Sequence, residues 1–253
     1  MFYDINGNVI YPVYTLDGTA QGYAYGIDGK MAYINGAEKY PKFSILGDSI
    51  STFERYIPEG NRVWYPQEAD YNDVQRVEET WWKMFEAEFG SVIEINESYS
   101  GSPVAYDTSV DGVDSGAKTW SFIGRCGNVG NPDLILIFGG TNDSGIINTH
   151  GGTVGEYKYA DWTDDDLTAY RPALAYLLNK LMTDHPSAQI VFMLGSWIIA
   201  SVKESTHTIC DHYNVPCVDL TNVSMAGGHP NKAGMVTIKN QLIAFMAANG
   251  LVD

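Results

Sequence analysis

The sequence predicts a three-layer α/β/α domain with a five-stranded parallel sheet, preceded by a small β-rich appendage at the N-terminus. Two observations lead to this prediction. From residue 42 onward, strand-like segments alternate with amphipathic helical segments, which is the pattern of βα units around a parallel sheet. Several of the strand-like segments are continuous apolar runs, as expected for strands that helices cover on both faces.

The composition is that of an acidic globular protein. The 253 residues include 15 Lys plus Arg and 31 Asp plus Glu, which gives a formal net charge of −16. Such a protein lacks the basic stripe that binding to nucleic acid or to an anionic membrane requires. The longest apolar runs, such as Leu134–Phe138, are far shorter than the ~20 residues that span a bilayer. We therefore expect no nucleic-acid partner and no membrane insertion.

The cellular compartment stays open at this stage. The first residues show neither the basic start nor the apolar stretch of a secretory signal, although such a signal can have been removed. The three cysteines are an odd number and do not form the pattern of a disulfide framework. A secreted or periplasmic location is slightly favoured over a cytoplasmic one.

Residues 1–41 differ in composition from the rest of the chain. They contain seven of the 17 tyrosines and many glycines. Short alternating stretches between Asn-Gly and Asp-Gly pairs are typical of β-hairpins. We expect a small β-rich appendage at 1–41, with a strand or two packed on a main domain that spans 42–253, rather than an independent binding module.

Five strands are expected in the main domain, in chain order. Each is a short apolar run bounded by polar residues or glycine. The five predicted strands are Phe43–Gly47, Ile93–Asn96, Leu134–Phe138, Ile190–Leu194 and Val215–Leu220.

Three amphipathic segments between and after these strands predict helices. The first presents one apolar face from Val74 to Phe85. The second presents a stripe from Leu167 to Leu181, with Thr163 and Asp166 as an N-terminal capping pair. Pro172 must either kink this helix or lie in the first turn of a shorter one. The last helix is expected from Pro230 to Asn249, with Gly250 ending it.

Three long segments show no clear periodicity. Loops of this length in a compact domain are usually lids or binding loops. They follow the first, second and third strands, whose carboxyl ends are where ligands bind in open parallel sheets. The three segments are Phe53–Asp73, Ser102–Asn131 and Ser144–Trp162.

Four polar or small residues lie just beyond the ends of predicted strands. Ser49 follows the first strand in Gly-Asp-Ser, and Gly101 follows the second strand in Ser-Gly-Ser. Asn142 follows the third strand in Gly-Gly-Thr-Asn, and His229 lies beyond the fifth in Gly-Gly-His-Pro-Asn. Acyl transfer needs a nucleophile, a base and hydrogen-bond donors directed at a developing oxyanion. The residue types present match that set.

This ordered set resembles the SGNH, or GDSL-type, hydrolase superfamily of esterases and lipases, which has a flavodoxin-like fold. The resemblance implies that Ser49 is the nucleophile and His229 the general base. It further implies an oxyanion hole made by the backbone N–H groups of Ser49 and Gly101 and by the side-chain amide of Asn142. The implied activity is a serine esterase that works through an acyl-enzyme without a cofactor.

The sequence departs from the family pattern at one position. The family usually carries an aspartate three residues before the histidine, where this chain has Ala226. Three explanations are open: a Ser49–His229 dyad whose ring is held by a backbone carbonyl, another acid such as Asp219, or loss of activity. Because the residues that match the rest of the family pattern are all present, namely Ser49, Gly101, Asn142 and His229, we favour an active dyad.

A second cluster suggests a metal site only superficially. A fourth predicted helix has an apolar stripe from Val202 to Tyr213. His207 and His212 are five residues apart on it, whereas two ligands on one helical face are spaced four apart. Cys210 falls on the apolar stripe of that helix and Cys217 in a buried strand, so both are expected to pack in the core. We predict no metal and no cofactor.

Aromatic residues concentrate in the first and third of the long segments. They suit stacking on sugar rings better than enclosing a long acyl chain, and we select Tyr56, Trp64, Tyr65 and Tyr157 as candidate substrate contacts. The sequence therefore favours removal of acetyl groups from carbohydrate as the reaction, with a small-molecule or glycan ester as substrate. The alternatives are a lysophospholipase or thioesterase of the same superfamily, or an inactive glycan-binding domain. The oligomeric state stays open.

Overall fold

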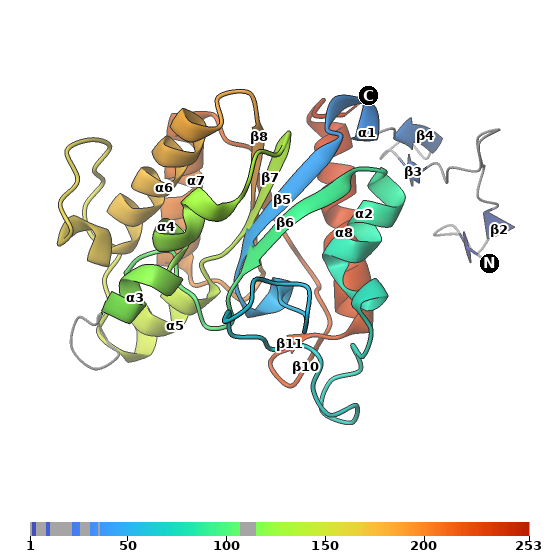
Figure 1. The fold of residues 1–253 in the computed structure, drawn as a ribbon, viewed down its shortest axis with the longest axis horizontal. Coiled ribbons are helices and arrows are strands. Elements are labelled where there is room, and N and C mark those ends of the chain that lie inside the picture. Colours follow the sequence, from blue (N-terminus) through green and yellow to red (C-terminus); the bar gives the residue numbers. More distant parts are fainter. Residues whose placement is uncertain are drawn as a thin grey trace.

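A five-stranded parallel sheet with helices on both faces forms the body of the protein (Figure 1). The computed structural model describes residues 2–3, 9–10, 22–25, 31–34, 36–106 and 115–252. The strands are in the order β6-β5-β7-β8-β9, and every neighbouring pair is parallel. This confirms the predicted three-layer fold.

The five strands lie where the apolar runs predicted them. Strand β5 leads to Ser49, and β7 is the third predicted strand. Both are almost wholly buried in the middle of the sheet, which explains their continuous apolar sequence. The last strand is shorter than predicted because only three of its residues pair with β8. The bounds are β5 Lys42–Gly47, β6 Val92–Ser98, β7 Leu134–Phe138, β8 Gln189–Leu194 and β9 Cys217–Asp219.

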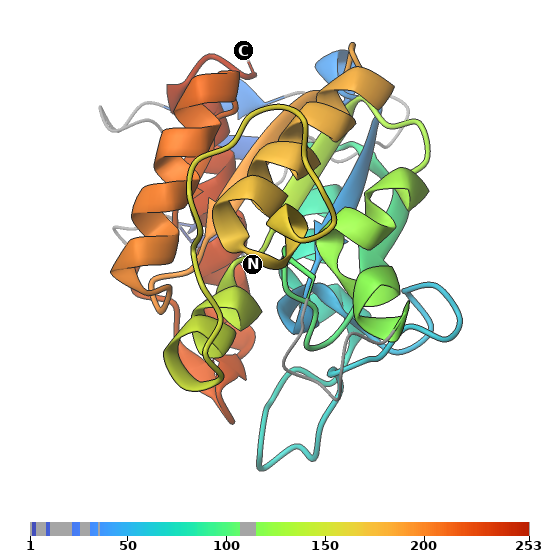
Figure 2. The same ribbon diagram turned by 90° about the vertical axis from the view of Figure 1, so that its left-hand side faces the viewer.

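The helices form two layers. Helices α2 (Trp81–Phe89) and α8 (Lys232–Ala248) cover one face of the sheet. Helices α4 (Phe122–Arg125), α6 (Tyr170–Asp184) and α7 (Ala200–Tyr213) cover the other face and lie in front of the sheet in Figure 2. Each layer buries its own apolar cluster against the sheet, and these two clusters make the core.

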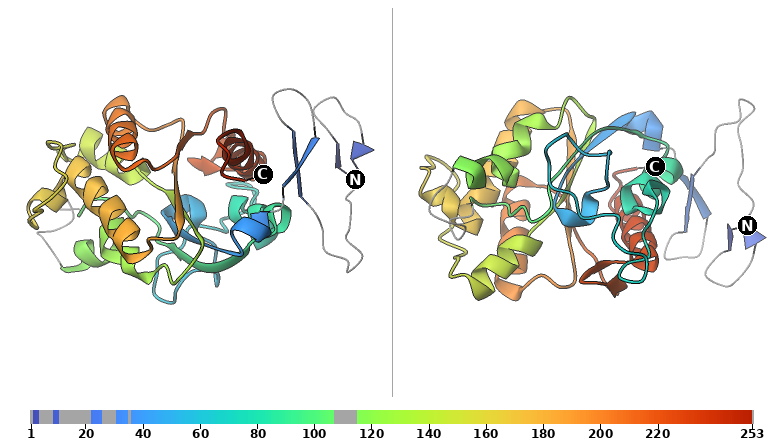
Figure 3. Two further views of the ribbon diagram at one scale, coloured as in Figure 1. Left: turned by 90° about the horizontal axis from the view of Figure 1, so that it is seen from above. Right: turned by 60° about the horizontal axis from the view of Figure 1, so that its bottom comes forward.

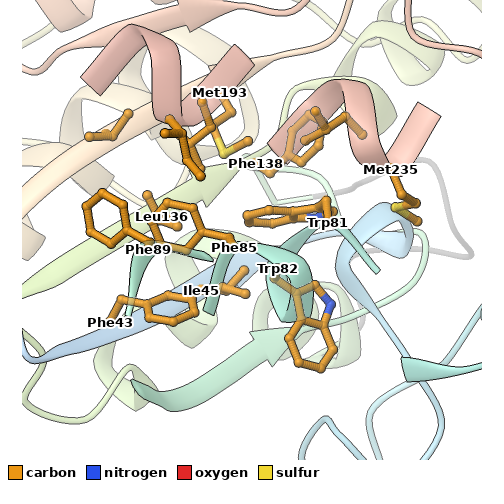
Figure 4. Packing of buried hydrophobic residues seen from close by; sticks show 14 of the residues in the cluster. Phe43, Ile45, Trp81, Trp82, Phe85, Phe89, Leu136, Phe138, Met193 and Met235 are labelled. Carbon is orange, nitrogen blue, oxygen red and sulfur yellow. The ribbon is translucent and has the colours of Figure 1, made fainter. Parts of the chain in front are cut away.

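Aromatic side chains dominate the cluster between the sheet and α2. Phe43 of β5 meets Phe85 of α2 edge to face, with ring centroids 5.2 Å apart, and Phe85 stacks on Phe89 at 4.4 Å (Figure 4). Trp81 packs edge-on against Phe138 of β7 at 6.0 Å. These contacts fix α2 over the strand that leads to Ser49.

The first predicted helix begins later than its apolar face suggested. Val74 and Val77 are buried as predicted, but a 3₁₀ turn, η2 (Val77–Glu79), precedes the helix. Thr80 has an extended backbone, and its hydroxyl accepts a hydrogen bond from the N–H of Lys83, so it caps α2 at Trp81. The hydrophobic pattern cannot predict where such a cap lies, because the residues before and after it are buried in the same core.

The proline of the second predicted helix lies in its first turn. Helix α6 begins at Tyr170, so Pro172 occupies a position whose N–H would have no partner within the helix. Thr163 and Asp166 do form a reciprocal hydrogen-bonded pair. That pair stabilises the preceding 3₁₀ turn, η4 (Asp166–Thr168), rather than α6, so the predicted cap of the long helix was wrong.

Two of the three segments without periodicity contain helices. Ser102–Asn131 includes α3 (Ser115–Trp120), α4 and the 3₁₀ turn η3 (Cys126–Asn128). Helix α5 (Thr141–Thr149) begins just before the predicted loop Ser144–Trp162 and fills its first part. These helices are too short or too polar to show a period. In contrast, Phe53–Asp73 is described throughout and contains neither helix nor strand, as predicted.

The described parts of the N-terminal segment form antiparallel strand pairs, as predicted for 1–41. Strand β1 (Phe2–Tyr3) pairs with β2 (Val9–Ile10), and β3 (Gly22–Tyr25) pairs with β4 (Met31–Ile34). The turns that the sequence predicts between them lie outside the described residues. Strand β3 contacts α2 and α8 (Figure 3). Helix α1 (Gly36–Lys39) then leads into β5.

Candidate active site

Ser49 lies at the carboxyl end of the strand β5. The chain leaves β5 at Gly47 and enters a 3₁₀ turn, η1 (Ser49–Ser51), which Asp48 caps by accepting a hydrogen bond from the N–H of Ile50 at 3.0 Å. A Cβ at Gly47 would lie 2.6 Å from Ser98 Oγ, so only glycine lets the turn approach β6 this closely. Ser49 is held with 6% of its surface exposed.

His229 reaches Ser49 from a two-stranded hairpin at the same edge of the sheet. Strand β10 (Met225–Ala226) pairs with β11 (His229–Pro230) across a turn of two glycines with positive φ (Figure 1). The Asn72 amide donates to the Ala226 carbonyl at 2.9 Å and the Tyr65 hydroxyl donates to the Pro230 carbonyl at 2.7 Å. These bonds place His229 Nε2 2.8 Å from Ser49 Oγ.

The surroundings of His229 keep its ring neutral. Burial lowers the pKa of His229 to about 4, and the nearby backbone of Gly227 acts weakly in the opposite direction. Nδ1 has no well-formed hydrogen bond among the described residues, and the Gly227 backbone is the polar group that acts on the ring besides Ser49. With its proton on Nδ1, the neutral ring presents a free lone pair on Nε2 to the Ser49 hydroxyl.

No carboxylate in the described part of the chain takes the place of the missing aspartate. Asp219, one of the alternatives, is engaged elsewhere: it lies 3.0 Å from His207 Nε2 and 2.8 Å from Lys203 Nζ, both on α7. The explanation by Asp219 was therefore wrong. Ala226 offers only its carbonyl, which accepts from Asn72. The pair Ser49–His229 stands without an acid on Nδ1.

The predicted oxyanion-hole residues lie at the carboxyl ends of the neighbouring strands. Gly101 follows β6 with a φ of +90°, and Asn142 is the second residue of α5. One N–H of the Asn142 amide donates to the Ser102 carbonyl at 2.9 Å, which orients the amide and leaves its second N–H available. No described residue accepts a hydrogen bond from the backbone N–H of Ser49 or Gly101. These three donors can serve a substrate oxygen.

A buried arginine that the sequence did not single out connects these segments. The Arg125 guanidinium is 3% exposed and donates to the Gly47 carbonyl at 3.1 Å and to Ser102 Oγ at 2.8 Å. It also donates to the Glu97 carbonyl and lies 3.6 Å from the Glu97 carboxylate. Burial lowers the pKa of Arg125 to about 10, so it remains charged. Arg125 thus joins the strand before Ser49, β6 and the loop that orients Asn142.

Asp48, next to Ser49, is a second buried ionisable group. Desolvation raises the pKa of Asp48 to about 7, although the N–H of Ile50 and the side chain of Thr141 partly offset this. Since the pKa is higher in the folded than in the unfolded chain, the folded state binds this proton more tightly. The stability it contributes is present below pH 4 and is lost as the pH rises to about 7.

We therefore predict that Asp48→Asn changes the pH dependence of stability. Asparagine keeps the acceptor for Ile50 but cannot ionise, so it avoids a cost on the order of 4 kcal/mol that ionised Asp48 imposes above pH 7. The difference in Tm between the variant and the wild type should grow as the pH rises from 4 to 8 in circular-dichroism melts. The exposed Asp70→Asn controls for the loss of one negative charge. An equal difference at all pH values would contradict the prediction.

The four candidate substrate contacts fall in different places. The Trp64 ring stacks on the His229 ring, with centroids 3.7 Å apart and planes 19° apart, and Tyr65 meets the same ring edge-on at 6.1 Å. Tyr56 is 47% exposed near the start of the same segment. Tyr157 lies over the Arg171 guanidinium at 4.3 Å, on the outer surface of α6 and α7.

Tyr157 therefore has no contact with the catalytic pair. Its neighbour Tyr159 stacks on His212, which is in the last turn of α7. Because α7 runs from the carboxyl ends of the strands back to their amino ends, His212 lies at the edge opposite Ser49.

The residues that suggested a metal site do not gather into one site, although Cys210 lies beside Cys217. Cys210 is fully buried in the core, and His207 pairs with Asp219. Within the described ranges, no three His, Cys, Asp or Glu side chains gather closely enough to hold a metal ion. In the same ranges, no helix is both long and apolar enough to cross a membrane.

Comparisons with known proteins show the family to which the chain belongs. The model of the GDSL-like lipase/acylhydrolase family matches residues 41–246. The structure of a GDSL-like lipase from Bacteroides ovatus ATCC 8483 has a TM-score of 0.76 and 39% sequence identity, covering 82% of this chain and 98% of that chain. A GDSL-like lipase from Bacteroides uniformis ATCC 8492 has a TM-score of 0.76 and 42% identity, with coverages of 82% and 96%.

A more distant structure shares the fold alone. It is an acetyl xylan esterase from the rumen bacterium Butyrivibrio proteoclasticus, with a TM-score of 0.54, 17% identity, and coverage of 88% of this chain and 67% of that chain. No curated protein matches the chain. The match of the family model and the two Bacteroides structures together cover the whole sheet and its helices. This chain therefore belongs to the GDSL-like lipase/acylhydrolase family and is a hydrolase of ester bonds.

Proposed function

We propose that this hydrolase is a serine esterase that cleaves short-chain carboxylic esters, acetyl esters foremost, through an acyl-enzyme on Ser49. The observation that carries the proposal is the 2.8 Å contact between His229 Nε2 and Ser49 Oγ. A serine hydroxyl becomes a competent nucleophile when a neutral base accepts its proton as it attacks. The unengaged N–H groups of Ser49 and Gly101 lie at the same edge of the sheet.

Acylation follows from these positions. Ser49 Oγ attacks the ester carbonyl carbon while its proton passes to His229 Nε2. The carbonyl oxygen becomes an oxyanion that the N–H groups of Ser49, Gly101 and Asn142 stabilise. Collapse of the tetrahedral intermediate breaks the bond to the alcohol oxygen, which takes the proton from Nε2 and leaves. The acyl group then remains on Ser49.

Deacylation repeats the sequence with water as the nucleophile. Water gives a proton to His229 Nε2 and attacks the acyl carbon, which forms a second oxyanion in the same hole. When this intermediate collapses, the bond to Ser49 Oγ breaks and Oγ takes the proton from Nε2. The carboxylic acid is released, and the enzyme returns to its starting protonation state without a cofactor.

The aromatic segment supports a carbohydrate ester as the substrate. Tyr71 is 54% exposed and packs against Gly227, next to His229, while the partly buried Trp64 covers the catalytic ring. Flat aromatic faces beside a catalytic pair suit the faces of sugar rings better than a flexible acyl chain. An acetyl xylan esterase has the same fold. Removal of acetyl groups from a glycan is thus our first choice of reaction.

Labelling with a fluorophosphonate probe tests the proposal. The probe reacts with an activated serine, so we expect the wild type to be labelled and Ser49→Ala to remain unlabelled. A panel of p-nitrophenyl esters and acetylated xylo-oligosaccharides then ranks the substrates. Absence of labelling, together with retained binding of the oligosaccharides, would favour an inactive glycan-binding domain. Preference for long acyl chains would favour a lysophospholipase instead.

The low pKa of His229 predicts an unusually broad pH range of activity. Because the base must be neutral, kcat/KM should rise as the pH increases through about 4 and stay constant from about pH 5.5 upward. An unperturbed histidine would instead give half-maximal activity near pH 6.5. Initial rates on p-nitrophenyl acetate between pH 3.5 and 8, corrected for spontaneous hydrolysis, measure this midpoint. A midpoint near 6.5 would contradict the prediction.

A further inference from the structure

The catalytic ring of His229 is held by contacts other than a carboxylate. Its Nε2 meets Ser49, its Nδ1 has no hydrogen-bond partner among the described residues, and Trp64 covers one of its faces. The 19° angle between the planes and the 3.7 Å distance between the centroids describe a true stack rather than an edge contact. The ring therefore has one polar contact and one broad apolar support.

Trp64 is itself fixed to the serine turn. Its backbone N–H donates to Thr52 Oγ1 at 2.9 Å, and Thr52 Oγ1 donates to the Ser49 carbonyl at 2.9 Å. Tyr65, the next residue, is buried and bonds to the Pro230 carbonyl beside His229 at 2.7 Å. The segment that bears Trp64 is thus connected at one side to Ser49 and at the other to the hairpin of His229.

We propose that the indole of Trp64 is a positioning residue that replaces the missing aspartate by holding the face of His229 and stabilising its cation during catalysis. The inference rests on the proposed function, because it gives Trp64 a role only through a base that acts on Ser49. Stacking restricts rotation of the ring and keeps Nε2 directed at Ser49 Oγ. The electron-rich face of indole also attracts the imidazolium that forms when Nε2 takes the proton.

The remaining polar groups near the ring do not compete for this role. Tyr65 meets the ring edge-on, and burial raises its pKa, so its phenol stays neutral. Asp48 lies behind the serine turn and accepts from Ile50, and Asp73 accepts from the N–H of Lys232. The Tyr71 ring packs against Gly227 rather than on the imidazole.

The hairpin also offers a way to restore the absent acid. Ala226 and His229 are directly opposite each other in the antiparallel pair, so their side chains project to the same face with Cβ atoms ~5 Å apart. An aspartate at 226 can therefore reach the imidazole ring. If Trp64 performs the work of that acid, Ala226→Asp should compensate for its removal.

The test compares Trp64→Leu, Trp64→Phe and Trp64→Leu/Ala226→Asp with the wild type on p-nitrophenyl acetate. We expect Trp64→Leu to lower kcat by about 10-fold, on the order of one desolvated cation–π contact, with little change in KM. Its pH midpoint should also move downward, because the imidazolium loses the attraction of the indole face, and an upward shift would contradict stabilisation of the cation by Trp64. Trp64→Phe should stay within about threefold of the wild type, and Ala226→Asp should recover most of the lost kcat.

A remote tryptophan supplies the matched control. Trp162 packs edge-on against Tyr176, and its ring N–H donates to the Lys158 carbonyl, away from Ser49. Trp162→Leu removes a comparable ring, and we expect kcat and the pH midpoint to remain as in the wild type. An equal loss of kcat in Trp162→Leu would overturn a specific role for Trp64.

Fluorescence keeps the proposal testable if Trp64→Leu does not fold. Protonated imidazole quenches a stacked indole more strongly than the neutral ring does. The fluorescence of Trp64 is the wild-type emission minus that of Trp64→Phe. This difference should therefore decrease as the pH is lowered, with the same midpoint as kcat/KM. A difference spectrum without this transition would overturn the proposal.

The experiments also distinguish failure of the proposed esterase function from failure of the proposed role of Trp64. A wild type that neither turns over an ester nor reacts with the fluorophosphonate would overturn the proposed function and this role with it. An active, Ser49-dependent wild type with an unaffected Trp64→Leu would overturn the role of Trp64 alone.

Discussion

Replacing Ser49 by alanine should lower kcat for ester hydrolysis by a factor on the order of 10³ to 10⁶. The variant removes the atom that carries the acyl group, so what remains is the contribution of substrate binding and of the oxyanion donors. His229→Ala should cost about as much, and the double variant should be no worse than either single one, because the two residues act as a unit. Steady-state rates on p-nitrophenyl acetate, with single-turnover measurements for the slow variants, provide the comparison.

Two controls accompany this prediction: substitution of a serine outside the site, and a check that the variant is folded. Ser187→Ala changes an exposed serine in the turn before β8, at the edge opposite Ser49, and should leave kcat unchanged. Thermal melts should show that Ser49→Ala retains the wild-type fold. If Ser49→Ala kept more than a tenth of the wild-type kcat, Ser49 would not be the nucleophile, and the acyl-enzyme mechanism would have to be abandoned.

Replacing Arg125 by methionine should cause the largest loss of stability among single changes near the site. Methionine fills much of the same volume but leaves the buried Glu97 carboxylate without its cationic partner, and the Gly47 carbonyl and Ser102 Oγ each lose one donor. Breaking one side of a buried ion pair typically costs about 3–5 kcal/mol. Urea denaturation should therefore show a lower midpoint with an unchanged slope.

Two further variants show whether the unpaired charge of the Glu97 carboxylate causes the loss of stability. Arg125→Met/Glu97→Gln removes that charge and should be more stable than Arg125→Met alone. Arg76→Met removes an arginine that pairs with Glu79 at 2.9 Å but has 72% of its side chain exposed, and it should cost less than about 1 kcal/mol. An equal cost for Arg76→Met and Arg125→Met would refute the importance of burial at Arg125.

The elements that the sequence predicted well are those with strong local signals. The central strands β5 and β7 are continuous apolar runs because helices cover both of their faces, and such runs can be read directly. Helix α6 was anticipated from its apolar stripe, and Pro172 limited where its first turn could begin. Helix α5 was missed because most of its residues are polar or small, and only Asp143 and Ser144 are buried.

The position of the candidate site residues at one edge of the sheet could also be predicted, but not the contacts that support them. Ser49, Gly101 and Asn142 each follow a parallel strand, and the carboxyl ends of such strands meet at one edge. The extent of the N-terminal appendage, with its boundary near residue 41, stays a prediction. Tyr157 was grouped with Trp64 on composition alone, which does not say which edge of the sheet a loop faces.

The sequence by itself determined the fold and the family and proposed Ser49 and His229 as the catalytic pair, because hydrophobic periodicity and short motifs are properties of neighbouring residues. Only the tertiary structure decided that Asp219 is engaged by α7, that Arg125 connects three segments of the site, and that Trp64 covers His229. Trp64 and His229 are far apart along the chain, so their contact exists only after the sheet and hairpin have formed. Interactions between such distant residues depend on packing geometry, and one sequence carries no local signal of it.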